Sequence, residues 1–352
     1  MTANESGTSP RELRVGVIGL GMGRHHVVAF NAHPHARVVA LCDLDADRLA
    51  SIGDEHAIDA RYDDAAKMLA EQDLDIVSVA TPNRFHHPLT LQAIEAGAHV
   101  LCEKPMAMNA AEGREMVDAA SAAGRKLAIH YNHRQRADVQ VMGRYIEAGE
   151  LGQVYFVRTT WHRRRGIPGR PTFVSRQHSG GGCLIDLGVH IIDIALYLAR
   201  FPRIVSVSGQ VHRKFDQKYV PHLAMDVEDF ATAYVRCEGG LTIAIEVSWA
   251  SHHDHAEQML THVYGSEAGL TRRIEHYADP QIRLHKLEHG SLVTSRIETM
   301  PTDVLSVQED LVNAVLEDRE PACSAEHGLM LMQVLDALYT SSQSGREVVL
   351  GT

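Results

Sequence analysis

The stretch from Leu13 to Asp43 constrains the fold more than any other part of the chain. It holds, in order, an apolar run, three glycines, a helical pattern and a second apolar run: Val15–Ile18, then Gly19, Gly21 and Gly23, then Arg24–Ala32, then Arg37–Cys42. Apolar runs without polar alternation indicate strands buried on both faces. Strand, glycine turn, helix and strand in this order predict the opening unit of a doubly wound parallel sheet.

The glycines also predict a phosphate-binding turn. Gly19 would allow the sharp turn after the strand, and Gly21 would let backbone approach a pyrophosphate at the helix N-terminus. The usual G-x-G-x-x-G spacing is not met, because Arg24 occupies the third glycine position and the glycine is at 23. Asp43 follows that glycine by 20 residues (43 − 23), the separation expected of an acid that binds a ribose hydroxyl.

The acid favours NAD over NADP as the dinucleotide. A carboxylate at Asp43 would repel the 2′-phosphate of NADP, and the residues from Leu44 to Asp47 offer no cation before Arg48.

Length and composition favour two domains in a reducing compartment. A chain of 352 residues is long for one core, and its formal net charge of −11 argues against nucleic acid or an anionic membrane as partner. Its 5 cysteines are scattered without a C-x-x-C pair, which indicates neither disulfides nor structural zinc. Residues 1–12 look like a disordered lead-in rather than a signal peptide, and no run approaches the ~20 apolar residues of a membrane span. We therefore expect a cytoplasmic protein.

Strand and helix patterns alternate as far as residue 134 and then change. The first part predicts an α/β Rossmann domain over 13–134, with strand order 3-2-1-4-5-6 and helices on both faces. The second part, 135–352, contains a strong helix over Leu184–Ala199, many strands and two closing helices. It predicts an α+β domain with a large open, mainly antiparallel sheet and helices on one face.

In such sheets the ligand lies outside the carboxyl ends of the strands. Three groups of polar residues follow predicted strands of the first domain: Thr81-Pro82-Asn83 with His86, Glu103-Lys104-Pro105, and Asn132-His133-Arg134. We expect these loops to face the same crevice as the glycine turn.

Three titratable residues are candidates for chemistry. Lys104 precedes Pro105 at a strand end, where it would either point into the crevice or lie on the solvated surface; position alone does not decide. Asp186 and His190 are four apart on an apolar helix and should share a face. They form either a functional pair or a buried, satisfied core pair, and Asp193 could hold the second nitrogen of His190.

Taken together, these motifs resemble those of the Gfo/Idh/MocA oxidoreductases. The matching residues are the glycine turn, the three strand-end groups, Gly149–Gly152, and Gly180–Gly182 through Asp186, Gly188 and His190. The resemblance implies an NAD(P)-dependent enzyme acting on a sugar, cyclitol or related polyol, and a homodimer or homotetramer built through the C-terminal sheet. It implies that Lys104, Asp186 and His190 form the catalytic group.

The resemblance also implies the binding residues. The expected cofactor contacts are Gly19, Leu20, Gly21, Met22, Gly23, Asp43, Leu44, Thr81, Pro82, Asn83, His86, Glu103, Lys104 and Asn132. The expected substrate contacts are Lys104, Asn132, Trp161, Asp186 and His190.

Residue chemistry agrees with oxidation of a secondary alcohol. We assign His190 as general base, Lys104 as the cation that stabilises the developing alkoxide, and Asp186 as the group that binds a neighbouring hydroxyl. Which of His190 and Lys104 takes the proton is left open. One alternative is a glycosidase that uses transient oxidation by bound NAD followed by elimination. A second is a non-catalytic NAD-binding regulator.

Other histidines are weaker candidates. The run from His252 to His255 could reach the sugar site or bind a metal, but it has no regular zinc spacing, so no metal is expected. His25 and His26 begin the first helix near the expected pyrophosphate. His162 with Arg163–Arg165 belongs either to a solvent-facing loop or to the substrate pocket.

Overall fold

The computed structural model describes residues 11–276 and 278–351, so nearly all of the expected lead-in lies outside the described residues. The chain forms two compact units. The first runs to Glu103 and adds Glu115–His130 and Leu305–Ala325. The second contains Lys104–Arg114, Tyr131–Val304 and the chain from Glu326 onward.

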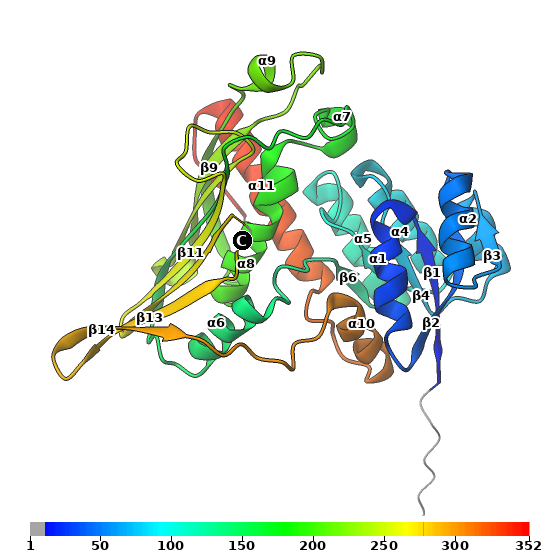
Figure 1. Cartoon of the computed structure of the whole chain (residues 1–352), viewed down its shortest axis with the longest axis horizontal. Helices are drawn as coiled ribbons and strands as arrows, with labels where there is room; N and C mark the ends of the chain where they lie inside the picture. The colour runs from blue at the N-terminus through cyan, green and yellow to red at the C-terminus, as the bar shows by residue number, and fades with distance from the viewer. Residues whose placement is uncertain (1–10, 277, 352) are drawn as a thin grey trace, which may run out of the picture. The chain divides into compact units, whose positions relative to one another are not determined.

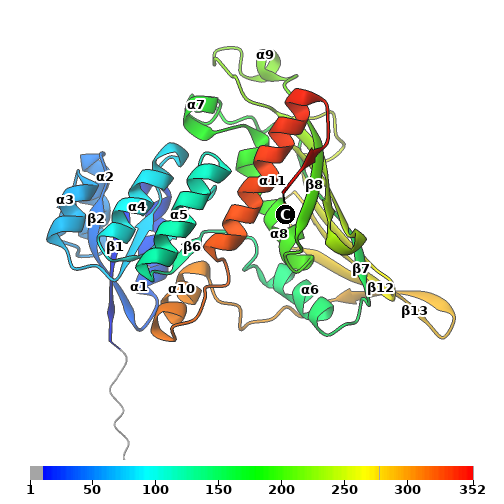
Figure 2. The same ribbon diagram turned by 180° about the vertical axis from the view of Figure 1, so that it is seen from behind.

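The first unit contains a six-stranded parallel sheet in the predicted order, β3-β2-β1-β4-β5-β6. Its strands are β1 Leu13–Ile18, β2 Ala36–Cys42, β3 Ala60–Tyr62, β4 Ile76–Val79, β5 His99–Cys102 and β6 Leu127–Ile129. Its helices are α1 Leu20–Asn31, α2 Ala46–Glu55, α3 Ala65–Glu71, the 3₁₀ turn η1 Asn83–Phe85, α4 His86–Glu95, the part of α5 Ala110–Ala123 from Glu115 onward, and α10 Val307–Leu316. α1 and α10 lie on one face of the sheet (Figure 1), and α3, α4 and α5 lie on the other (Figure 2).

Helix α1 begins at Leu20, earlier than the predicted Arg24. Gly19 completes the turn alone, with φ of 87° and its N–H donating to the Cys42 carbonyl over 2.8 Å. The two later glycines therefore lie in the first turn of the helix, where they do not break it.

The second unit contains a nine-stranded sheet in the order β14-β13-β12-β11-β7-β10-β9-β8-β15. Its strands are β7 Val154–Arg163, β8 Ile204–His212, β9 Phe230–Cys237, β10 Thr242–Ser248, β11 Glu257–Gly265, β12 Ala268–Glu275, β13 Gln281–Glu288, β14 Ser291–Ile297 and β15 Val348–Val349. All neighbours are antiparallel except β7 and β10, which confirms the mainly antiparallel prediction. The turn η3 Glu238–Gly240 joins β9 to β10.

Helices α6, α8 and α11 lie along one face of this sheet (Figure 1). The helical segments of the unit are α6 Ala137–Glu147, α7 Arg176–Ser179, the π-helical turn η2 Leu184–Gly188, α8 Val189–Leu198, α9 Asp216–Tyr219 and α11 Ala325–Ser344. Every residue of α8 except Tyr197 is buried, which makes this helix the centre of the unit's core.

One stretch, Arg176–Leu198, is long and apolar enough to cross a membrane by length and composition, contrary to the sequence-based reading. It is interrupted by a left-handed residue at Gly180, and 89% of its most apolar window is buried inside the fold. These are the properties of a core segment.

Candidate functional site

The glycine turn of the first unit fits a dinucleotide phosphate. A Cβ on Gly19 would lie 2.7 Å from the Ala80 backbone, whereas a Cβ on Gly21 would meet nothing within 4 Å. Gly23 allows α1 to pack closely against β1, as the third glycine of the usual motif does, because a Cβ at Gly23 would lie 2.8 Å from Val17 of β1. The N-cap residue Gly19 has no side chain to cap α1, so the N–H groups of the first turn that follow Leu20 can face an anion.

Asp43 directly follows β2, and its carboxylate lies at the start of α1. Its carboxylate accepts a hydrogen bond from Leu20 N over 2.6 Å and one from Asp45 N over 2.9 Å. Arg48 Nη1 lies 3.1 Å from Asp43 Oδ2. Arg48, the first cation after Asp43 in the sequence, is therefore paired with that acid.

The other expected cofactor contacts of this unit vary in exposure. Met22 and Leu44 are exposed, at 56% and 89%. Thr81 and Pro82 precede η1, which begins at Asn83. His86 is buried, and its Nε2 lies 2.8 Å from the Thr81 carbonyl oxygen.

Glu103 and His26 belong to a buried network. Glu103 Oε1 lies 3.1 Å from His26 Nε2 and 2.8 Å from His130 Nδ1, and His26 Nδ1 lies 2.7 Å from Ser78 Oγ. Burial opposes ionisation of Glu103, but the two histidines hold its pKa well below the usual range. Among the described residues, His26, Glu103 and His130 are the one set of three histidine, cysteine or carboxylate side chains whose ligand atoms lie close enough together to hold a metal ion. Glu103 lies within hydrogen-bond distance of both histidines.

The candidate catalytic residues all belong to the second unit. Lys104 Nζ donates to the main-chain oxygen of Asp186 over 3.0 Å and lies 3.4 Å from Asp186 Oδ1. Trp249 Nε1 donates to Asp186 Oδ2 over 3.0 Å. Lys104 and Asp186 keep 20% and 21% of their side chains exposed. The site thus holds a cation and an anion that a substrate can still reach.

The local fold explains the placement of Asp186. Glu228 is buried, and its Oε1 accepts hydrogen bonds from Gly182 N over 2.8 Å and Leu184 N over 3.0 Å. A Cβ on Gly182 would lie 1.9 Å from the Glu228 carbonyl oxygen, so only glycine fits this approach. The chain then enters the π-helical turn η2, which contains Asp186, rather than the regular helix predicted there. Such turns are frequent at functional sites.

His190 follows on α8, in a cluster of three rings. The His190 and His133 ring centroids are 4.3 Å apart with planes at 26°, and His133 and Trp161 are 5.4 Å apart at 28°. Trp161 Nε1 donates to Glu257 Oε1 over 2.6 Å, and Arg163 Nε donates to the same oxygen over 2.7 Å. The buried carboxylate of Glu257 therefore fixes the Trp161 ring of this cluster.

A buried ion pair fastens His133 to the helix that bears His190. Arg134 donates through Nε and Nη2 to the two carboxylate oxygens of Asp193, and both side chains are 1% exposed. Asp193, which we considered as a partner for His190, is thus held by Arg134. Asn132, on the other side of His133, is exposed.

His133 is a neutral imidazole. Burial lowers the pKa of His133 to about 3, and the positive charges of Arg272, Arg136 and Lys104 act in the same direction. Its Nδ1 is buried and has no hydrogen-bond partner among the described residues. Sequence reasoning placed His133 in a strand-end motif but gave it no role, and it passed over Trp249, whose signal was an aromatic residue directly after a strand.

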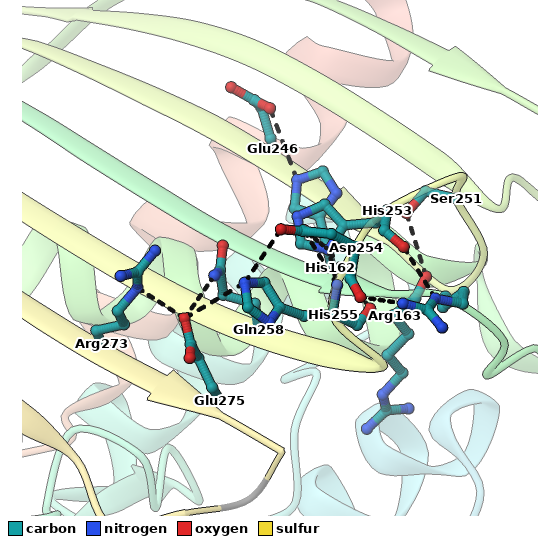
Figure 3. Close-up of polar contacts among 11 residues, drawn as sticks. His162, Arg163, Glu246, Ser251, His253, Asp254, His255, Gln258, Arg273 and Glu275 are labelled. Atoms are coloured by element: carbon teal, nitrogen blue, oxygen red, sulfur yellow. Dashed lines mark hydrogen bonds and ion pairs between the residues drawn. The ribbon is translucent and has the colours of Figure 1, made fainter.

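The run from His252 to His255 has its contacts on the face of the nine-stranded sheet opposite Trp161. His162 alternates with Trp161 and so projects to the opposite face of β7. Figure 3 shows His162 beside Glu246, 3.6 Å away, and His255 beside Glu275, 3.4 Å away. The His253 ring stacks on His162 with centroids 5.4 Å apart.

The neighbouring arginines also have protein partners. Arg164 donates to the main-chain oxygens of His253 and Asp254, and Arg165 lies 5.2 Å from the centre of the Tyr219 ring. Of the three arginines, Arg163 alone contacts the Trp161 ring, at 5.4 Å.

Comparison with known proteins agrees with both units. The family model described as "Oxidoreductase family, NAD-binding Rossmann fold" matches residues 13–131, and "GFO/IDH/MocA C-terminal domain" matches residues 139–271. The chain is 32% identical to D-glucoside 3-dehydrogenase of Escherichia coli, over 98% of this chain and 100% of the relative. It is 29% identical to D-apiose dehydrogenase of Paraburkholderia graminis, over 97% and 91%. It resembles the crystal structure of aldose-aldose oxidoreductase from Caulobacter crescentus complexed with glycerol, with a TM-score of 0.83, 28% identity and coverage of 97% and 100%.

Proposed function

Because this chain belongs to the Gfo/Idh/MocA family of NAD-binding oxidoreductases, we propose that it oxidises a secondary hydroxyl of a sugar or related polyol. Relatives similar over nearly the whole chain are named as dehydrogenases of a glucoside and of apiose, which supports a carbohydrate substrate. When bound, NAD supplies the hydride acceptor. The glycine turn and Asp43 are the residues that would hold it.

The observation that carries the proposal is the contact between Lys104 and Asp186. Asp186 lies in η2, which continues directly into α8, the helix that bears His190. The ammonium of Lys104 is fixed by the main-chain oxygen of Asp186 at 3.0 Å. A cation held in this way can stabilise the negative charge that develops on a hydroxyl oxygen as it loses its proton.

His190 is the proton acceptor in this proposal. An imidazole titrates near neutral pH and can take a hydroxyl proton there. The stack with His133 and Trp161 restricts the orientation of the His190 ring. Orientation of this kind lowers the entropic part of the barrier.

Asp186 has two roles in the proposal. It anchors Lys104, and it binds a hydroxyl next to the reacting carbon. One oxygen of its carboxylate accepts from Trp249 and the other faces Lys104. A carboxylate oxygen has more than one lone pair, so Asp186 can accept a further hydrogen bond from substrate.

A substrate panel tests the proposal. The purified protein is incubated with NAD and, separately, with D-glucose, methyl β-D-glucoside, D-apiose and myo-inositol, and NADH is followed by absorbance. We expect NADH formation with at least one sugar. No NADH with any of them would contradict the proposal, and release of an aglycone from a glucoside without NADH would favour the glycosidase alternative.

We also propose that a second copy of the chain covers the face of the nine-stranded sheet opposite α8. A groove of about 540 Å³ lies on the sheet and is lined in part by Leu260, Tyr264 and Arg283. Tyr234 and Tyr264 are 54% and 37% exposed. Light scattering after size exclusion should give a dimer or tetramer, and Tyr264→Glu should shift it toward the monomer.

A further inference from the structure

His133 is a polar residue of the second unit that the proposed mechanism does not use. A buried imidazole nitrogen without a hydrogen bond is costly, and such groups in native proteins need an explanation. Nδ1 of His133 is buried and makes no hydrogen bond to any described residue. A phenylalanine would fill the same space without that cost.

The surroundings of His133 are built rather than accidental. Its ring packs against both Trp161 and His190, at 5.4 and 4.3 Å, and the centroids of those two rings are themselves 6.0 Å apart. The Trp161 ring is fixed by the hydrogen bond that its Nε1 donates to Glu257. The next residue, Arg134, is bound to Asp193, one helical turn from His190. The contacts of Trp161 and Arg134 therefore hold the His133 ring in a stack on the ring that we assign as the base.

We propose that His133 is a substrate-binding residue, whose imidazole hydrogen-bonds a sugar hydroxyl adjacent to the one that faces His190. This inference rests on the proposed function and adds a specificity-determining residue to it. A neutral imidazole offers one donor and one acceptor, which matches a hydroxyl group. It carries no charge, so it does not favour an anionic ligand.

The electrostatics of the site agree with this role. Lys104, Arg136 and Arg272 all disfavour protonation of His133, as does burial, so the ring stays neutral at the pH where His190 must accept a proton. Two neighbouring imidazoles can therefore have different tasks: His190 takes the proton and His133 holds the sugar.

The test compares two substitutions of His133. His133→Phe keeps a ring that can stack but removes both nitrogens, and His133→Asn keeps a side chain that can donate and accept. His99→Phe is the control, because His99 begins β5 in the first unit, where its Nδ1 accepts a hydrogen bond from Lys126 N. Thermal unfolding of each variant shows whether it is folded.

Sugar affinity is read without turnover. The chain has 2 tryptophans, and both lie in this site: Trp161 stacks on His133 and Trp249 bonds Asp186. Quenching of their fluorescence by methyl β-D-glucoside, D-apiose, D-glucose and myo-inositol gives a Kd for each protein. We expect His133→Phe to weaken binding of the preferred sugar about 10- to 100-fold, which corresponds to one lost hydrogen bond. His133→Asn should recover part of that loss, and His99→Phe should bind like the unaltered protein.

Stability separates a substrate role from a structural one. If His133 served only the fold, His133→Phe would lower the melting temperature. The inference predicts an equal or higher melting temperature together with weaker sugar binding, because the substitution removes an unsatisfied buried nitrogen. Unchanged sugar affinity in His133→Phe, or no sugar binding by the unaltered protein, would overturn the inference. Sugar binding without NADH formation would contradict the proposed function and leave the role of His133 standing.

Discussion

Lys104 and Asp186 are joined twice, once through the main-chain oxygen of Asp186 and once through its carboxylate, over 3.0 and 3.4 Å. The first contact fixes where the ammonium lies, and the second places a carboxylate beside it. A residue pair of this kind can be approached by a hydroxyl without reorganisation of the protein, which is the property required of an electrostatic catalyst.

Replacement of His190 should cause a loss that depends on pH. We expect His190→Ala to lower kcat about 10²- to 10⁴-fold near pH 7, because the proton acceptor is removed. The loss should shrink toward pH 10, where hydroxide can take the proton. Profiles of kcat between pH 6.5 and 10 measure this, with His178→Ala as control, since His178 lies on α7 and bonds Ser175, the N-cap residue of that helix. An equal loss at every pH would contradict the assignment.

Asp43 should set the choice between NAD and NADP. Its carboxylate is positioned by Leu20 N and paired with Arg48. We expect Asp43→Ala to lower kcat/KM for NAD and raise it for NADP, moving their ratio about 10- to 100-fold, because one charged hydrogen bond is lost and Arg48 is released toward the phosphate. The double variant Asp43→Ala with Arg48→Ala should lose the gain with NADP. An unchanged ratio in Asp43→Ala would show that another residue selects the cofactor.

The Arg134–Asp193 pair should matter for stability more than its exposed counterparts. Breaking a buried pair leaves one charge unpaired, so Asp193→Ala should lower the free energy of unfolding by about 3–5 kcal/mol. Breaking the exposed pair of Arg203 and Glu238 should cost under about 1 kcal/mol. Urea unfolding followed by tryptophan fluorescence compares Asp193→Ala with Glu238→Ala. Similar losses in the two variants would contradict this account.

The low pKa of His133 predicts a destabilisation by acid. Its pKa is about 3 in the folded protein against 6.5 ordinarily. Between these values the unfolded chain binds the proton and the folded chain does not, so stability is complete above pH 6.5 and falls as the pH drops toward 3. One such group contributes up to about 1.4 kcal/mol per pH unit. Melting temperatures at pH 7, 5.5 and 4 should fall less steeply in His133→Phe than in the unaltered protein. Equal slopes would contradict the pKa.

The order of the first sheet could be predicted because parallel strands leave strong local signals. Buried apolar runs, glycine turns and right-handed crossovers together admit few topologies. The first residue of α1 was harder to predict, because Gly21 and Gly23 look like turn residues in the sequence. The positive φ of Gly19 shows that the turn is complete before them.

The site could be predicted only in part. Lys104, Asp186 and His190 were identified from motif and resemblance, and the structure joins Lys104 to Asp186 and stacks His190 on His133. The π-helical turn depends on Glu228, which is remote in sequence from the backbone N–H groups that it binds. No local pattern encodes such a contact. The same holds for the stack of His133 on His190, which depends on Arg134 meeting Asp193.

The most direct test of the central claim is Lys104→Ala, assayed with the preferred sugar and NAD. We expect kcat to fall about 10²- to 10³-fold, as for loss of one oxyanion-stabilising donor. NAD binding, measured by calorimetry, should stay close to that of the unaltered protein. Lys126→Ala is the matched control, because Lys126 pairs with Glu320 and Asp318 in the first unit. Full activity in Lys104→Ala, with NAD binding retained, would contradict the account.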